Sequence, residues 1–339
     1  MTRPILSRVA LYAFIGFSLL FSDPAYSEEV LRRSNFEIEV GAKTWISQGR
    51  TKWSHNAGDP LLGNPTSELN YKDVWSNVAE IDGKVTLRNG WFFRGQFGYG
   101  AINSGTLVDD DYVSAAGAAF FGTTVSGAHR FSRTESDIDG SHLWYLNADF
   151  GLRLLEFSGG RGSLKGFVTY QHWEEKYVAK GIKQLECTAL TPSPIQCAPP
   201  GTVGFVGQKV ITNEVAWDSI RLGLEGEYRI TRRFSFDGSV AFIPYTSLNN
   251  RDIHHVRNDL RQDPSFSMSG TGIGANFELN ASYMIVKQLF FDLGYRYWWL
   301  RVTDGDWKAY PVGGPTVSAN LNEFQTIRQG VTLGLRYQF

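Results

Sequence analysis

The sequence predicts an all-β fold: a ten-stranded antiparallel up-and-down transmembrane β-barrel with long extracellular loops. Three observations predict it: apolar and polar residues alternate in many short segments, short and long connections alternate between these segments, and the chain stops on such a segment at Phe339. Alternation with period two places successive side chains on opposite faces of a strand. In a closed barrel one face then contacts lipid and the other faces the lumen.

The last segment, residues 329–339, shows the alternation most clearly. Its polar face carries Arg336, which would be costly against lipid, and its apolar face ends on aromatic residues, which are favoured at a membrane interface. A chain that stops on such a strand is typical of a barrel in the outer membrane of a Gram-negative bacterium. The apolar face consists of Val331, Leu333, Leu335, Tyr337 and Phe339.

The N-terminus and the composition agree with an exported protein. Residues 1–27 are predicted to be a signal peptide, because Arg3 and Arg8 precede the apolar run 9–21 and small residues flank Tyr26 at a cleavage site. The barrel domain is therefore expected to span residues 28–339. No later stretch offers about 18 consecutive apolar residues, so any membrane crossing uses strands. A net charge of -1 argues against a nucleic-acid partner.

Each predicted strand is a period-two segment. Ten are found, an even number as expected for a single-chain bacterial barrel. Charged residues on the inward faces predict a narrow, packed lumen rather than an open pore. The segments are 36–46, 74–88, 91–99, 142–154, 164–178, 215–230, 234–245, 268–285, 289–302 and 329–339.

The connections between these segments alternate strictly between short and long. Only an up-and-down barrel gives this alternation, with tight periplasmic turns at one end and extracellular loops at the other. The short connections lie around 89–90, 156–163, 231–232 and 286–287, and the long ones are 47–73, 102–141, 181–210, 246–265 and 303–321.

The two cysteines, Cys187 and Cys197, both fall in the third long connection. In an exported protein this pair predicts a disulfide that closes a small surface loop, worth about 2 to 3 kcal/mol of loop order in the chain-entropy model. A metal site would need further cysteine or histidine ligands, and the loop has none.

Two polar clusters in the predicted outer loops are candidates for chemistry. Asp109 and Asp111 flank Asp110 in the second long connection, and Asp252 precedes His254 by two residues in the fourth. Residues two apart on an extended backbone project to the same side. A carboxylate beside a histidine orients the imidazole, and two close carboxylates resist double ionisation, so together they could activate a water for attack on a carbonyl.

A solvated acidic loop or a calcium site would have the same composition. Simple continuation of the strand alternation also places both clusters on the lipid face. Gly105 and Pro244 intervene, and a bulge or turn near each could shift the alternation.

The chain resembles the omptin family of outer-membrane endopeptidases. The resemblance runs over the mature chain and includes 68–71, 108–112, 145–150, 170–171, the Asp252 and His254 motif, and the last strand. It implies an aspartic-type endopeptidase in which Asp109 and Asp111 hold and polarise a water, His254 is the general base and Asp252 orients His254. It implies that no metal, no cofactor and no covalent intermediate take part. It also implies extracellular peptide or protein substrates, and a monomer in contact with membrane lipid and lipopolysaccharide.

Some residues depart from the omptin pattern. Omptins that cleave beside basic residues resemble each other in carrying acidic side chains at two positions of the substrate pocket. In this chain Trp53 and Asn250 occupy these positions, so the pocket lacks a counter-charge for Arg or Lys. Of the family's lipopolysaccharide-binding positions, Tyr170 is kept, but His172 and Glu174 differ. Dependence on lipopolysaccharide therefore stays open.

Two other function classes stay open beside an endopeptidase. A non-enzymatic barrel, such as an adhesin or a structural protein, could keep the scaffold and the acidic loops. A lipid A hydrolase would need an inward nucleophile constellation at the lipid boundary, and the sequence shows none.

Overall fold

The computed structural model describes residues 36–122, 129–191 and 197–339, so the predicted signal peptide lies outside the described residues. Strands dominate these ranges, with one short helix, α3 (Ala115–Phe120). None of the helices in these ranges is long and apolar enough to cross a membrane. The strands are β1 (Phe36–Asn56), β2 (Leu62–Leu87), β3 (Trp91–Val113), β4 (His129–Ile138), β5 (Ser141–Phe157), β6 (Gly162–Cys187), β7 (Val203–Arg229), β8 (Phe234–His254), β9 (Phe266–Val286), β10 (Leu289–Val302), β11 (Gly305–Ala309) and β12 (Val317–Gln338).

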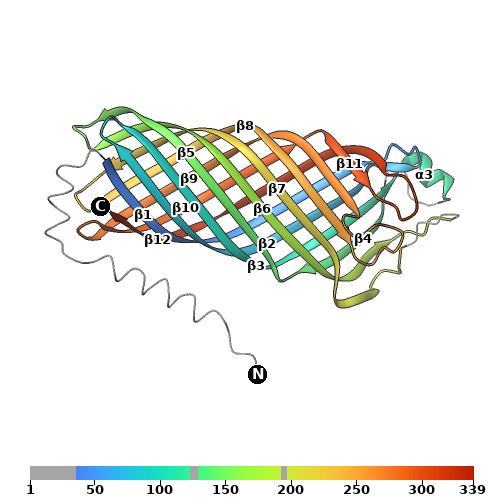
Figure 1. Cartoon of the computed structure of the whole chain (residues 1–339). Coiled ribbons are helices and arrows are strands. Elements are labelled where there is room, and N and C mark those ends of the chain that lie inside the picture. Colours follow the sequence, from blue (N-terminus) through green and yellow to red (C-terminus); the bar gives the residue numbers. More distant parts are fainter. Residues whose placement is uncertain (1–35, 123–128, 192–196) are drawn as a thin grey trace, which may run out of the picture.

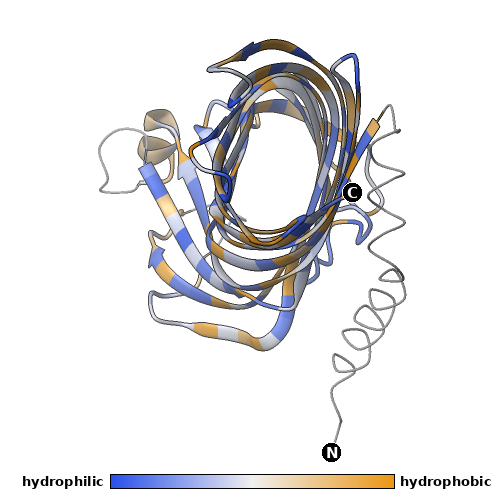
Figure 2. Cartoon of the chain, turned by 90° about the vertical axis from the view of Figure 1, so that its left-hand side faces the viewer, coloured by the Kyte–Doolittle hydropathy of each residue, from blue (hydrophilic) through white to orange (hydrophobic). Residues whose placement is uncertain are grey.

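The strands form one antiparallel sheet that closes on itself, because the first strand pairs with the last. The β1–β12 ladder runs from Glu39 opposite Gln338 to Asn56 opposite Asn320. Figure 2 shows the resulting ring viewed from one end. A closed ring leaves no unpaired edge, which is what strands require inside lipid. The predicted antiparallel barrel is therefore confirmed.

The described barrel contains twelve strands rather than the expected ten, yet its ring is ten strand positions wide. The difference arises because two positions are occupied by two strands each. β4 and β5 both lie between β3 and β6, and β10 and β11 both lie between β9 and β12. The first interruption is a turn at Gly140, which has a φ of +75°.

The loops are shorter than predicted, because the strands are longer. Most of the five segments predicted as long loops continue the strands, and β1 and β2 leave only residues 57–61 between them. Strand pairing satisfies backbone hydrogen bonds and does not depend on which side chains the strands carry. Pairing therefore continues into segments that lack the period-two hydrophobic pattern. The short turns lie as predicted; Gly90, with a φ of +92°, closes one of them.

Large apolar side chains face outward in a band around the barrel. On β3 the exposed members end at Tyr99, and on β8 they end at Tyr245. Both strands continue beyond this band toward the end that carries α3, β4 and β11 (Figure 1). We call this end the mouth, and the opposite end, where the short turns and the C-terminus lie, the turn end. The outer parts of β3 and β8 therefore lie outside the lipid-facing band.

Paired charges and aromatic rings fill the lumen, in agreement with the prediction of a packed interior. Arg296 donates two hydrogen bonds to Glu80, at 2.6 and 3.3 Å. Trp45 and Trp298 pack against the same guanidinium, 5.0 and 5.2 Å from their ring centres. Each guanidinium proton directed at a carboxylate offsets part of the cost of burying the charge.

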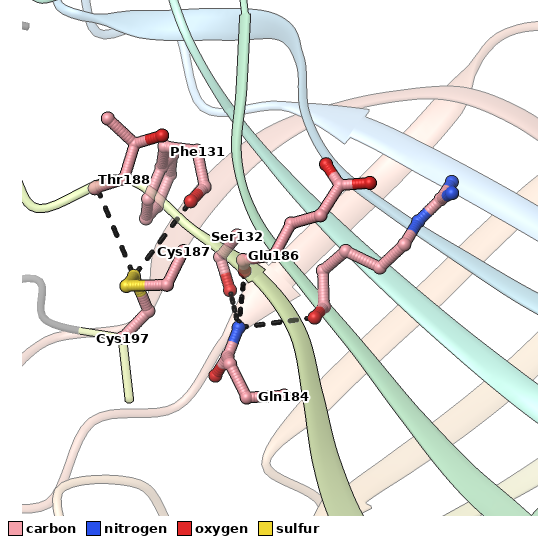
Figure 3. The surroundings of a disulfide bond; sticks show 8 residues. Phe131, Ser132, Gln184, Glu186, Cys187, Thr188 and Cys197 are labelled. Carbon is pink, nitrogen blue, oxygen red and sulfur yellow. Dashed lines mark hydrogen bonds between the residues drawn. A yellow bond between two sulfur atoms is a disulfide. The ribbon is translucent and has the colours of Figure 1, made fainter. Parts of the chain in front are cut away.

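The disulfide joins Cys187, the last residue of β6, to Cys197, with the Cα atoms 5.7 Å apart. The base of this loop is fixed to β4, as Figure 3 shows. Gln184 Nε2 donates to Ser132 Oγ at 3.1 Å and to the carbonyl oxygen of Glu186 at 2.7 Å. The disulfide therefore links Cys197 to the end of a strand that is itself bonded to β4.

Candidate active site

A change of phase in β3 turns two of its three consecutive aspartates toward the lumen. Asn103 and Ser104 are both exposed, and the register against β2 shifts at this point. Beyond the shift, Asp109 lies opposite Leu69. Paired residues share a face of the sheet, and Leu69 is a buried core residue. The irregularity expected near Gly105 thus directs the side chain of Asp109 inward, and that of Asp111 with it.

The third aspartate, Asp110, points the other way and is neutralised. Arg133 of β4 donates two parallel hydrogen bonds to its carboxylate, both at 2.7 Å. The inward pair has a different neighbour, Ser67 of β2, whose Oγ donates to Asp109 Oδ1 at 3.3 Å and which lies opposite Asp111 in the β2–β3 ladder. The fold therefore separates one ion-paired aspartate from two that adjoin the same hydroxyl.

A second change of phase occurs in β8. Pro244 and Tyr245 are both exposed, and the register against β9 shifts between Ile243 and Thr246. Before the shift the buried residues are odd-numbered, and after it they are even-numbered. Proline lacks the N–H that a regular ladder needs, so it is found at such bulges. The shift brings Asp252 and His254 into the lumen.

Asp252 and His254 form a hydrogen-bonded dyad. His254 Nε2 lies 3.1 Å from Asp252 Oδ2, and Asp252 has no exposed surface. The ring of Phe266 packs edge-on against the imidazole with the centres 4.8 Å apart. The backbone N–H of His254 donates to Ser265 Oγ at 3.0 Å. The imidazole is thus fixed by β9 as well as by its own strand.

The two pairs interact across the mouth, outside the lipid-facing band. Burial, followed by the charges of Asp111 and Asp252, raises the pKa of Asp109 well above its ordinary value. Burial also raises the pKa of Asp111, although the Ser67 hydrogen bond and the charge on His254 oppose this rise. Three close carboxylates cannot all ionise cheaply, so Asp109 holds a proton more tightly than an isolated aspartate does.

Arg257 brings a positive charge toward the same carboxylates. Its guanidinium donates to both carboxylate oxygens of Asp259, at 2.8 and 2.6 Å. Asp259 is the main cause of the raised pKa of Arg257, and the charges of Asp111 and Asp109 add to it. The charge on this guanidinium is therefore balanced mainly by Asp259.

The family can be assigned from the sequence match. The family model described as "Pom: Protochlamydia outer membrane protein" matches residues 47–339. The chain belongs to this family. The protein is thus an outer-membrane barrel, surrounded by the lipid and lipopolysaccharide of that membrane. No curated protein matches the chain.

Two solved structures illustrate what this Protochlamydia outer membrane protein family member is similar to. The outer-membrane protease OmpT from Escherichia coli has a TM-score of 0.66 at 16% identity, covering 89% of this chain and 97% of that chain. The translocator domain of the autotransporter NalP from Neisseria meningitidis has a TM-score of 0.35 at 11% identity, covering 98% of both chains. The OmpT likeness supports an omptin-like barrel fold but not membership of the omptin family.

In this Protochlamydia outer membrane protein family member, Trp53 and Asn250 are buried packing residues. Trp53 is 2% exposed, and Asn250 is fully buried. Asn250 Nδ2 donates to Asn213 Oδ1 at 3.0 Å and to the carbonyl oxygen of Glu214 at 2.9 Å. Both side chains are therefore packed in the interior and present no charge to a ligand.

Tyr170 and His172 share a partner on the outside of the barrel. Tyr170 Oη donates to Asp218 Oδ1 at 2.6 Å, and His172 Nδ1 lies 2.9 Å from the same oxygen. Glu174 lies 3.9 Å from His172 Nε2. These residues form a polar cluster on the outer wall, away from the mouth of the lumen.

Sequence reasoning missed several residues that surround the four predicted ones. Ser67 adjoins the aspartate pair, Phe266 packs on His254, and Tyr71 and Asn213 lie beneath the dyad. The spacing of residues 67, 69 and 71 was a usable signal, because all three share the inward face of β2. Their partners on β3 and β8 could not be read from that spacing.

A separate cavity of about 410 Å³ opens at the turn end. Its lining includes Lys84, Arg161, Arg233 and Arg336, and none of the four predicted catalytic residues. The candidate site and this cavity therefore belong to opposite ends of the barrel.

Proposed function

We propose that this barrel is an outer-membrane endopeptidase of the omptin type, an aspartic-type hydrolase whose active face is extracellular. One observation carries the proposal: Asp109 and Asp111 from β3 and the Asp252–His254 dyad from β8 interact at the mouth, where the pKa of Asp109 is raised by burial and by the other carboxylates. The OmpT likeness supports the scaffold for such a site.

The dyad supplies the base. Because His254 Nε2 faces Asp252, its Nδ1 is the nitrogen that can accept a proton from water. The hydroxide formed attacks the peptide carbonyl, and the carbonyl oxygen takes up the negative charge. Asp252 stabilises the imidazolium that results and keeps the ring in place.

The aspartate pair holds the attacking water and supplies a proton for the hydrogen bond to the oxyanion. Asp111 accepts a hydrogen bond from the attacking water, and protonated Asp109 donates to the developing oxyanion. When the tetrahedral intermediate collapses, the proton on His254 moves to the leaving amine, which completes the hydrolysis. Ser67, which lies opposite Asp111 and donates to Asp109, holds the Asp109 carboxyl in place.

Basic residues are not the preferred substrate side chains. Trp53 and Asn250 offer no counter-charge for a basic side chain, and the charge of Arg257 is balanced by Asp259. The substrate class is therefore a peptide with uncharged side chains next to the scissile bond.

Cleavage of a diverse peptide library tests the proposal. Refolded wild-type protein is compared with Asp109→Asn and His254→Ala, and with His255→Ala as a matched histidine control, since His255 Nε2 bonds Thr212 Oγ1 at 2.8 Å rather than a carboxylate. Cleavage by wild type and His255→Ala but not by the other two supports it. Equal inactivity of all four proteins would refute it.

A non-enzymatic barrel is the second candidate, favoured by the burial of Trp53 and Asn250, which leaves neither side chain exposed to a peptide. Envelope or host ligands that bind wild type and both inactive variants with the same affinity would support this role.

A further inference from the structure

Three buried polar atoms beneath the dyad have no hydrogen-bond partner among the described residues. They are Tyr71 Oη, Asn213 Nδ2 and Asp252 Oδ1. Tyr71, Asn213 and Asp252 have no exposed surface. Buried polar atoms nearly always bond to protein or to an ordered water, because an unpaired one costs about 1 to 3 kcal/mol. Three such atoms in one place therefore need a common partner.

The three atoms come from strands that meet at the dyad. Asn213 of β7 lies directly opposite Asp252 of β8 in the ladder, so their side chains share the inward face. Tyr71 projects from β2 and stacks on Tyr177, which lies directly opposite Asn213 in the β6–β7 ladder. After burial, the charges of Asp252 and then Asp109 raise the pKa of the Tyr71 hydroxyl, which agrees with a place beside the dyad.

The neighbouring tyrosine, Tyr177, differs from Tyr71 in the hydrogen bonds of its hydroxyl. Tyr177 stacks on Tyr71 with the ring centres 4.8 Å apart and is equally buried. Its hydroxyl has partners, however: it lies 2.9 Å from Thr51 Oγ1 and donates to Glu175. The lumen therefore satisfies one of two stacked phenols with protein atoms and leaves the other without a partner among the described residues.

The donor set identifies the missing partner. Asn213 Oδ1 already accepts from Asn250 Nδ2, so its Nδ2 is the group directed at the free space, and it is a donor. A cation would not bind beside this N–H. A water can accept hydrogen bonds from Asn213 and Tyr71 and donate one to Asp252 Oδ1. These three bonds are within the two to four that buried waters typically make.

We propose that Tyr71, Asn213 and Asp252 bind a buried water beneath the dyad, and that Tyr71 and Asn213 are positioning residues for His254. The water holds Asp252 Oδ1, so the carboxylate cannot rotate and Oδ2 stays on His254 Nε2. The water site stands on the three unpaired atoms alone, whereas its effect on catalysis rests on the proposed endopeptidase function.

A high-resolution crystal structure of the wild-type barrel tests the site directly. The expected result is an ordered water within about 2.6 to 3.2 Å of both Tyr71 Oη and Asp252 Oδ1. In Tyr71→Phe, which keeps the ring and loses the hydroxyl, the water should be lost or displaced. Tyr177→Phe is the matched control and should keep it. A direct bond between Tyr71 and Asp252, or an unmoved water in Tyr71→Phe, overturns the proposal.

Kinetics give the second readout. Tyr71→Phe should lower kcat by about 10-fold with KM unchanged, because the base is misplaced while the surface that contacts the peptide is intact. Tyr177→Phe should change kcat by less than about 2-fold. An unchanged kcat in Tyr71→Phe overturns the positioning role. If the wild type cleaves no peptide, the endopeptidase function fails, and the crystal structure alone decides the water site.

Discussion

His254 Nε2 lies 3.1 Å from Asp252 Oδ2, and this contact distinguishes His254 from its neighbour His255, whose Nε2 bonds a threonine hydroxyl. The carboxylate lies where it can stabilise the charge that the imidazole acquires when it takes a proton. The contact also holds the ring and occupies Nε2, so Nδ1 is the nitrogen left to accept a proton.

Replacing Asp252 by Asn should lower kcat by roughly 100-fold or more, because the amide cannot stabilise the imidazolium and can present an N–H to Nε2. Steady-state peptide cleavage measures the effect. Arg251→Ala is a suitable control, since Arg251 is exposed and pairs with Glu214 and Asp263 outside the dyad. A loss in Arg251→Ala as large as that in Asp252→Asn would contradict the orienting role.

Asp109→Asn should make the barrel more stable at neutral pH while abolishing activity. The folded-state pKa of Asp109 lies well above the ordinary value of 3.8, so the folded state binds its proton more tightly than the unfolded state does. The stability that this proton contributes is present below about pH 4 and is lost as the pH rises through the folded pKa. Asparagine does not ionise and escapes that loss.

Unfolding by denaturant at a series of pH values measures this effect. The advantage of Asp109→Asn over wild type should grow as the pH rises above about 4 and vanish below it. Asp110→Asn is the matched control and should give no gain, because it breaks the two hydrogen bonds from Arg133. An advantage of Asp109→Asn that is independent of pH would exclude proton binding as its cause.

Glu175→Gln should destabilise the barrel by about 3 to 5 kcal/mol, because it leaves Arg328 as an unpaired buried charge. Arg328 Nε lies 2.5 Å from Glu175 Oε1, and neither side chain has exposed surface. The exposed pair Arg153 and Glu156 provides the comparison, since Glu156→Gln should cost less than about 1 kcal/mol. Equal costs in reversible unfolding would show that burial does not govern the strength of these pairs.

Replacing Cys187 and Cys197 by Ser should loosen the loop without unfolding the barrel. The disulfide spans ten residues of sequence and closes a loop whose base is bonded to β4. Loss of the cross-link corresponds to about 2 to 3 kcal/mol of loop order. Limited proteolysis should cut the loop faster in the double variant, while the unfolding midpoint of the barrel changes little. A collapse of that midpoint would mean that the loop supports the wall.

Residues inside the lipid-facing band could be predicted from the sequence. There one strand face contacts lipid and the other the lumen, so the alternation from Val331 to Phe339 reports the environment of each side chain directly. The turn at Asn89 and Gly90 was equally clear, because a positive φ at Gly90 is a local requirement. These features depend only on neighbours in the sequence.

The mouth could not be predicted in the same way. The strands continue there without an apolar pattern, and the side on which a residue lies depends on the bulges at Asn103 and at Pro244. The sequence gives a reason to expect an irregularity near each cluster but does not give its phase. A shift by one residue would turn Asp109 and Asp252 outward.

The sequence by itself determined the barrel, its turns and the identity of Asp109, Asp111, Asp252 and His254, because alternation, turn residues and motif spacing are properties of a single segment. Only the tertiary structure decided that Asp110 pairs with Arg133 while its two neighbours turn inward opposite Ser67 and Leu69, and that Tyr71 stacks on Tyr177 beside Asn213. The physical reason is register: which side chains meet across the lumen depends on hydrogen-bonded pairing between strands far apart in the chain.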